Sequence, residues 1–248
     1  MASIPQASVS RPLRIPVTGR NGLLDRYFYF AMSLLVAVIV VWGFSHTVNA
    51  NLFHASPPRP LLLWIHAAVF SGWVVFFIVQ SALVRKHQVR WHRSMGWFGA
   101  VLGTTMIVLG TATAIVMGRF DTGQLHMPDS DAFLIVPLFD MVAFAASFGL
   151  AVYWRRKPER HRRLIFIATC GLLGAAFGRV DYLIQHDLTY VCVDGVITLG
   201  VARDLLVNRR IHSVYWIALP ALAVSQALVL HTFHSGSWWI SMAHWILR

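Results

Sequence analysis

Long runs of apolar residues with few or no formal charges divide this chain, and they restrict its fold more than any other feature. A helix rising about 1.5 Å per residue needs roughly 20 such residues to cross a bilayer. The runs cover residues 27–45, 60–84, 94–118, 132–154, 164–184, 188–206 and 213–230. The sixth is the least typical, because it is short and contains acidic residues. The pattern predicts an all-α, polytopic membrane protein built as a bundle of seven transmembrane helices.

Composition agrees with a membrane setting. Of the 248 residues, 57% are hydrophobic and 12% are charged, whereas soluble domains have about 25% charged residues. A soluble protein of this size could not bury so much apolar surface in one core. The lipid bilayer is therefore the expected partner of most of the surface.

The formal net charge of +11 by itself would suggest nucleic-acid binding, but the positions of the charged residues along the chain argue against it. They form short clusters between the apolar runs and no continuous basic stripe. Such clusters are typical of membrane topology, so nucleic acid is not an expected partner.

The basic residues also predict the orientation of the chain. Of the 21 Lys and Arg residues, all but Arg59, Arg119, Arg179 and Arg248 lie in the N-terminal segment or near the connections that follow even-numbered runs. By the positive-inside rule, the N-terminus is cytoplasmic and the C-terminus is external, which requires an odd number of crossings. We therefore expect a basic cytoplasmic tail at 1–26, a transmembrane domain at 27–231 and an external interfacial tail at 232–248.

Six polar residues are expected at one depth in the outer half of the membrane, counted from the predicted helix ends. They are His66, Asp140, Arg179, Asp194, Gln226 and His231. Ionisable groups at that depth are costly unless they face protein or a wet cavity. Arg179 is expected to pair with Asp140, Asp194 or both. This set either lines a pocket for a ligand, proton or metal, or only holds helices together.

A histidine beside arginine precedes three of the odd-numbered runs, on the expected cytoplasmic side. These residues are His92, His161 and His212. They provide an alternative metal or haem site, although the neighbouring arginines disfavour a bound cation and favour contact with lipid headgroups. A haem b needs two histidines that face each other between helices. On the outer side, His66 and His231 are the candidate axial ligands, with Arg179 near the propionates.

No motif decides whether the protein is an enzyme. A catalytic triad, a nucleotide-binding loop and an HExxH helix are all absent from the sequence. The two cysteines, Cys170 and Cys192, have no zinc-binding spacing and are expected to be buried apolar side chains.

Two stretches resemble an uncharacterised family of bacterial multi-pass membrane proteins. One extends from Leu63 through Gln80 to the Trp-His-Arg-Ser-Met-Gly segment that ends at Gly96; the other joins Arg160-His-Arg-Arg-Leu to Gly178-Arg179. The resemblance covers about residues 25–230. It implies a bacterial inner-membrane location and no known activity, and it matches His66, His92, His161 and Arg179 to recurrent positions.

Three functional hypotheses follow from the sequence. The first is an outer-facing pocket that binds haem or another small cofactor for electron transfer. The second is a proton-coupled transporter of small molecules, in which Asp140 and Asp194 bind protons and Arg179 acts as a gate. The third is a structural or assembly subunit of a membrane complex.

Overall fold

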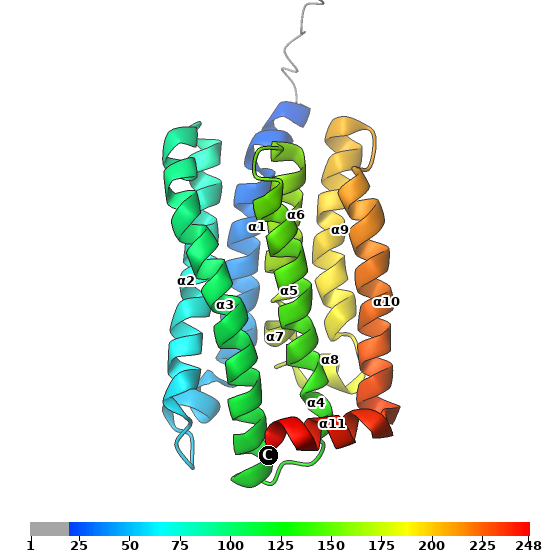
Figure 1. Cartoon of the computed structure of the whole chain (residues 1–248). Coiled ribbons are helices and arrows are strands. Elements are labelled where there is room, and N and C mark those ends of the chain that lie inside the picture. Colours follow the sequence, from blue (N-terminus) through cyan, green and yellow to red (C-terminus); the bar gives the residue numbers. More distant parts are fainter. Residues whose placement is uncertain (1–19) are drawn as a thin grey trace, which may run out of the picture.

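The computed structural model describes residues 20–248 and shows a bundle of roughly parallel helices (Figure 1). Most of the predicted tail, residues 1–19, lies outside the described part of the chain. In chain order the helices are α1 (Arg20–Ser45), the short π-helix η1 (Asn49–Phe53), α2 (Leu61–Arg85), α3 (Val89–Gly123), α4 (Ser130–Phe133), α5 (Ile135–Tyr153), α6 (Pro158–Gly171), α7 (Gly174–Phe177), α8 (Asp181–Gln185), α9 (Thr189–Asn208), α10 (Ser213–Ser235) and α11 (Ser237–Leu247).

Five helical segments are long and apolar enough to cross a membrane. They are Gly22–Ser45, Leu61–Arg85, Val89–Gly123, Ser130–Tyr153 and Ser213–Ser235. The chain is thus an all-α protein with the character of a multi-pass membrane protein, as its apolar runs predict. The fifth and sixth predicted runs are not among these spans.

Those two runs nevertheless lie inside the bundle. The fifth is interrupted and forms α6, α7 and α8, while the sixth forms α9, a continuous helix that contains Asp194, Arg203 and Asp204. α6 packs on α5 and α9, and α9 also packs on α1, α7 and α10. Both segments run alongside their neighbours in Figure 1.

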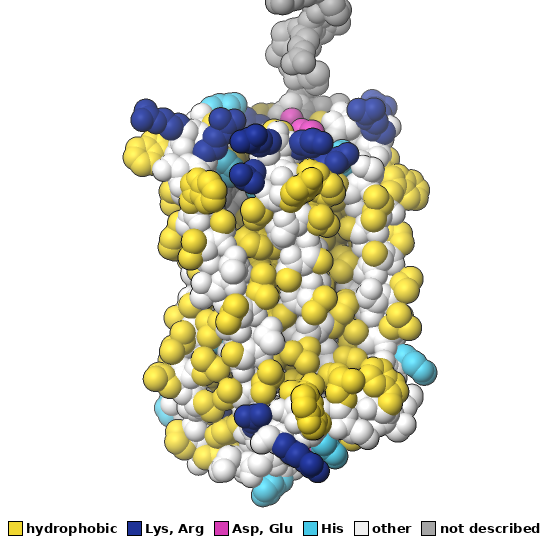
Figure 2. Space-filling view, in the orientation of Figure 1, with side chains coloured by type: hydrophobic (Ala, Val, Ile, Leu, Met, Phe, Trp, Pro, Cys, Tyr) yellow, Lys and Arg dark blue, Asp and Glu magenta, His cyan; other side chains and the backbone are white. Residues whose placement is uncertain are grey.

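The outer surface of the bundle is largely apolar over the middle of its length. Val41, Val101 and Ile217 are examples of large apolar side chains that remain well exposed. Figure 2 shows the apolar side chains spread along the visible face, with most Lys and Arg gathered at the end where the described chain begins. This separation is what a lipid environment favours, and we call that end the arginine-rich end.

The helices at both ends of the described chain extend beyond the predicted apolar runs. α1 begins at Arg20 and not at Tyr27, so Asp25 and Arg26 belong to its first turns. At the other terminus, α10 continues to Ser235, and residues 237–247 form α11. A prediction based on apolar runs does not include these extensions, because a helix can continue through polar residues at a membrane surface.

α11 lies across the end of the bundle opposite the arginine-rich end (Figure 1). The indole Nε1 of Trp239 donates a 3.0 Å hydrogen bond to the carbonyl of Ala132, and Arg119 donates to the carbonyl of Ile246 at 3.0 Å. The carboxylate of Asp131 lies 2.5 Å from His244. These contacts hold α11 against α3 and α4.

α1 approaches α7 closely at one glycine. A Cβ atom on Gly43 would overlap the backbone of Ala176. Because backbone cannot move aside as a flexible side chain can, this position requires a residue without a side chain. The contact fixes the interrupted segment α6–α8 against α1.

Candidate functional site

The candidate site is built around the interruption between α6 and α8. The helix ends at Gly171, resumes for one turn as α7, and breaks again before Asp181. Short-range bonds replace regular ones here, such as Leu173 N to Cys170 O at 2.9 Å and Val180 N to Phe177 O at 3.1 Å. Such backbone within a bilayer is tolerated only where protein covers it or where it lines a wet cavity.

Asp140 of α5 faces this interruption. The hydroxyl of Tyr190 on α9 donates a 3.0 Å hydrogen bond to Asp140 Oδ1. A methyl group placed on Gly174 would lie 3.5 Å from Asp140 Oδ2, so the carboxylate is in close contact with α7. The acid is thus held between α5, α7 and α9.

Arg179 follows α7 and turns toward α1. Its guanidinium lies 3.8 Å from the centre of the Phe44 ring and donates to the carbonyl of Ala175. Its Nε is buried and has no hydrogen-bond partner within the described part of the chain. Buried polar groups normally find a partner, so this nitrogen marks a place where water or a ligand would be stabilised.

His66 of α2 lies within electrostatic range of Arg179. The imidazole stacks on Phe70 with ring centres 3.9 Å apart, and its Nδ1 is buried without a partner. Arg179 forms no ion pair with Asp140 or Asp194 among the described residues, contrary to the expectation from sequence. Two unpartnered nitrogens and an unpaired cation therefore lie on the α1–α2 side of α7.

Asp194 and Gln226 form a separate contact. Gln226 Nε2 donates to Asp194 Oδ1 at 3.3 Å, joining α9 to α10, and Gln226 is buried. His231, one turn further along α10, is exposed. The six residues expected in one layer are thus divided into the Asp140–Tyr190 contact, the Arg179–His66 region and the Asp194–Gln226 contact.

The outer haem hypothesis gains no support from this geometry. α2 packs on α1 and α3, whereas α10 packs on α4, α5, α6 and α9. The two helices stand on opposite sides of the bundle in Figure 1. His66 and His231 therefore do not face each other as axial ligands of one iron would.

Two of the three histidines expected on the cytoplasmic side lie close together. The rings of His92 and His161 have centres 6.3 Å apart at an interplanar angle of 71°. His161 Nδ1 donates to the carbonyl of Ala151 at 2.9 Å, which leaves Nε2 as the free acceptor. His92 Nδ1 is buried without a partner. Within residues 20–248 there is no cluster of three or more His, Cys, Asp or Glu residues placed to hold a metal ion.

His212 has another role. Its ring Nδ1 accepts a 3.2 Å hydrogen bond from the backbone nitrogen of Val214 and caps the start of α10. Its own backbone nitrogen donates to Asp204 Oδ2 at 3.3 Å. It thus belongs to an ion network at the arginine-rich end and not to the His92–His161 pair.

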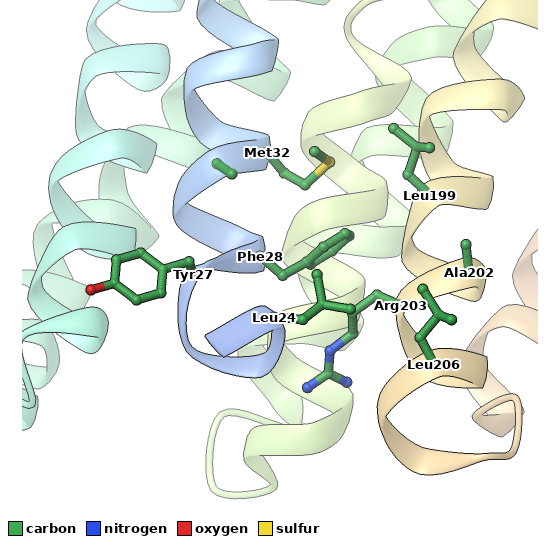
Figure 3. Close-up of a pocket in the computed structure, with 9 residues that line it drawn as sticks. Leu24, Tyr27, Phe28, Met32, Leu199, Ala202, Arg203 and Leu206 are labelled. Carbon is green, nitrogen blue, oxygen red and sulfur yellow. The ribbon is translucent and has the colours of Figure 1, made fainter. Parts of the chain in front are cut away.

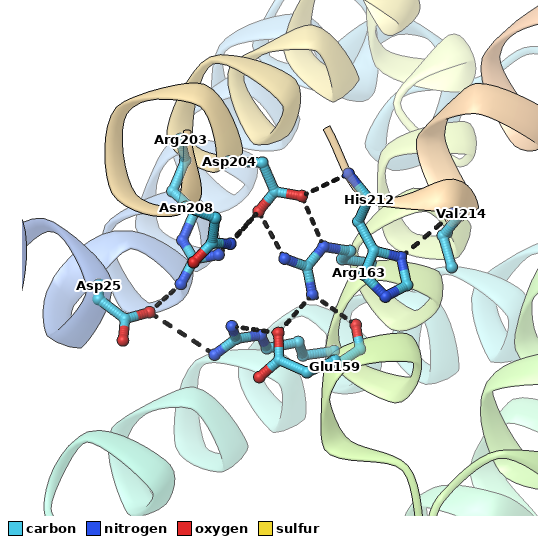
Figure 4. A network of polar contacts seen from close by, with 9 residues as sticks. Asp25, Glu159, Arg163, Arg203, Asp204, Asn208, His212 and Val214 are labelled. Carbon is cyan, nitrogen blue, oxygen red and sulfur yellow. Dashed lines mark hydrogen bonds and ion pairs between the residues drawn. The ribbon is translucent and has the colours of Figure 1, made fainter. Parts of the chain in front are cut away.

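That network, drawn in Figure 4, was not anticipated from the sequence. Arg163 Nε donates to Asp204 Oδ2 at 2.8 Å, and its terminal nitrogen donates to Oδ1 at 2.5 Å. Arg203 contacts both Asp204, at 2.7 Å, and Asp25. The side chains of Arg163, Arg203 and Asp204 are almost completely buried.

Glu159 and Arg162 complete the network at its exposed edge. Glu159 lies 2.7 Å from both Arg162 and Arg163. Burial raises the pKa of Glu159, but the two guanidinium groups outweigh it and hold that pKa below its ordinary value. Burial, with the charge of Arg163, also lowers the pKa of His212. The three arginines and three acids balance, so the network carries no net charge.

One signal for this network was present in the sequence. Asp25, Glu159 and Asp204 are acids on the side that is otherwise strongly basic. Acids among many arginines suggest pairing, but the pattern does not identify the partners.

Comparison with known proteins gives no match. No protein-family model, curated protein or solved structure is similar to this chain at a significant level. The resemblance to an uncharacterised bacterial family is therefore not confirmed, and function has to be argued from the geometry.

Proposed function

We propose that the chain crosses the membrane seven times, with α6–α8 and α9 as the two least apolar crossings. Two observations support this. α6 packs on α5 and α10, and α9 packs on α6 and α10, so both segments lie within the bundle (Figure 1). Their buried charges at the arginine-rich end are paired, which reduces the cost of placing them in the bilayer. The resemblance to bacterial proteins makes the inner membrane the proposed location.

Cysteine labelling tests this topology. In a Cys170→Ser, Cys192→Ser background, a membrane-impermeant maleimide added to intact cells should label His186→Cys, at the connection between α8 and α9. Lys157→Cys, before α6, should be labelled only after the cells are opened. Protection of His186→Cys in intact cells would contradict seven crossings.

We propose that the protein is a proton-linked carrier of a small anionic solute, with its site around α7. The observation that carries this proposal is that the interrupted helix lies between a carboxylate, Asp140, and a partly buried cation, Arg179, that has no counter-ion among residues 20–248. Carriers commonly place interrupted helices and ionisable groups at their substrate sites.

Each side chain has a distinct role in this proposal. Arg179 binds the anionic group of the solute through its unpartnered Nε, and His66 contributes a hydrogen bond from its free ring nitrogen. Asp140 takes up and releases the proton. Tyr190 donates a hydrogen bond to this carboxyl group and holds it beside α7. The glycines that flank α7 permit the segment to change its angle.

Proteoliposomes loaded with a pH-sensitive dye test the carrier function. Phosphate, succinate and glutamate would be added outside, with an inward proton gradient, and internal acidification measured. We expect one of these anions to accelerate proton entry. Asp140→Asn and Arg179→Gln should each reduce that rate at least tenfold, whereas Asp187→Asn, in the exposed connection before α9, should leave it unchanged. Equal rates in all four proteins and in empty vesicles would overturn the proposal.

A second candidate function, electron transfer through a haem b, has one specific observation in its favour. His92 and His161 are the histidine pair that the fold brings together, and the hydrogen bond from His161 Nδ1 to Ala151 is of the kind that orients an iron ligand. Protein purified from haem-replete cells should then show a Soret band that is lost in His92→Ala and His161→Ala and retained in His231→Ala. A spectrum without a Soret band would eliminate this function.

A further inference from the structure

A groove runs between α1 and α9 close to the arginine-rich end (Figure 3). It has a volume of about 300 Å³, and except for one arginine its lining is apolar or aromatic. Phe28 and Met32 contribute from α1, and Leu199 and Leu206 contribute from α9. Ala31 and Ala202 also line it, and because both are small and exposed the groove is open toward the surrounding lipid.

Arg203 supplies the one charged side chain of the groove. It is 1% exposed, and its terminal nitrogens are engaged by Asp25 and Asp204. Its Nε is also buried, and no polar atom is exposed in the groove, so Arg203 contributes only the aliphatic part of its side chain to the walls.

The groove follows the bundle from its middle toward the arginine-rich end. In Figure 3, Met32 and Leu199 lie at one end, and Arg203 lies at the other end beside Leu24 and Leu206. An apolar chain that follows these walls would therefore end close to the exposed cations of the arginine-rich end.

Charges around the groove favour an anionic headgroup. The ion network that includes Arg203 is neutral, so it does not offset neighbouring cations. Arg26, Arg209 and Arg210 are exposed at the same end and form no ion pair with another described residue. Exposed arginines beside the membrane attract anionic lipids.

We propose that the groove between α1 and α9 is a binding site for one anionic phospholipid of the leaflet at the arginine-rich end. One acyl chain lies along the apolar walls. The exposed side chains of Arg26, Arg209 and Arg210 attract the headgroup. This site is separate from the proposed carrier site around α7 and does not depend on it.

Native mass spectrometry of the full chain, released from mild detergent, tests the proposal. Phosphatidylglycerol and phosphatidylcholine of identical acyl chains are each added at equal concentration. We expect one tightly held phosphatidylglycerol per chain and at least fivefold less adduct with phosphatidylcholine. Ala202→Phe fills the groove and should reduce the phosphatidylglycerol adduct at least fivefold.

The matched control is Ala221→Phe, the same change at an exposed alanine of α10. It should retain the wild-type adduct. If Ala202→Phe is not monodisperse in size-exclusion chromatography, Ala31→Phe fills the groove from the opposite wall and should give the same loss. Equal binding of the two lipids, or undiminished phosphatidylglycerol binding in the well-folded filled variant, would overturn the proposal.

Discussion

Arg163 of α6 and Asp204 of α9 face each other through two hydrogen bonds, of 2.8 and 2.5 Å, and are almost completely buried. They connect the two segments that are least apolar in sequence. A buried ion pair often adds little net stability compared with an apolar pair, but it strongly penalises arrangements that separate the charges. Here it specifies that α6 and α9 pack side by side.

Removing one partner of this pair should destabilise the protein strongly. Asp204→Leu leaves Arg163 and Arg203 without their shared carboxylate, at a cost of about 3–5 kcal/mol. We expect a large fall in the unfolding temperature of the detergent-solubilised protein, followed by tryptophan fluorescence. The double variant Arg163→Met, Asp204→Leu should lose less than the sum of the two single variants, and additive losses would contradict a coupled pair.

Acidification should weaken the exposed edge of the same network. The pKa of Glu159 is held below its ordinary value. The contribution of Glu159 to the free energy of unfolding is therefore fully present above the pKa that it has in the unfolded chain, about 4.3. It is lost as the pH falls through the lower, folded pKa. Because Glu159 is half-exposed, the effect should stay below about 1 kcal/mol. Thermal unfolding at pH 7 and pH 3.5 should show a smaller pH dependence in Glu159→Gln than in wild type.

The close approach of α1 and α7 gives a matched pair of glycine variants. Gly43→Ala places a methyl group against the backbone of Ala176, whereas Gly72→Ala meets nothing within 4 Å. Overpacking of this kind costs about 1–3 kcal/mol. The first variant should unfold at a lower temperature and the second should not; equal unfolding temperatures would show that α1 and α7 are not in contact.

The docking of α11 can be tested with adjacent tryptophans. Trp239 is 6% exposed and donates to the carbonyl of Ala132, whereas Trp238 is 59% exposed. Trp239→Phe removes one buried hydrogen bond, worth about 1 kcal/mol, and leaves the carbonyl with one donor fewer. Limited proteolysis should cut the C-terminal helix faster in Trp239→Phe than in wild type, with Trp238→Phe as the unaffected control.

The all-α membrane architecture could be predicted from sequence because the length and composition of an apolar run are enough to indicate a helix that can cross a bilayer. The break at α7 could not, since residues 171–178 contain no proline and their glycines are equally common in continuous membrane helices. Only packing against Gly43 and Asp140 distinguishes this segment from a regular helix.

The sequence predicts residues for a candidate site but not their pairings. Depth along a helix follows from counting, so Asp140, Arg179 and His66 are expected in the outer half, and that position stays a prediction. Which of these side chains contact each other depends on the rotation of each helix and on the order of neighbouring helices. A single sequence gives neither. For the same reason Tyr190, the hydrogen-bond partner of Asp140, was missed, because a tyrosine in an apolar run looks like an ordinary core or interfacial residue.

The pairing of Arg163 with Asp204 also has a consequence for biogenesis. The two residues are 41 positions apart, so α6 leaves the ribosome before its counter-charge has been synthesised. A segment whose several arginines have only one acid, Glu159, in the same helix partitions poorly into lipid on its own. Under the proposed topology of seven crossings, we therefore expect α6 to wait beside the translocon, sheltered by α5, until α9 arrives and the two enter the bilayer together.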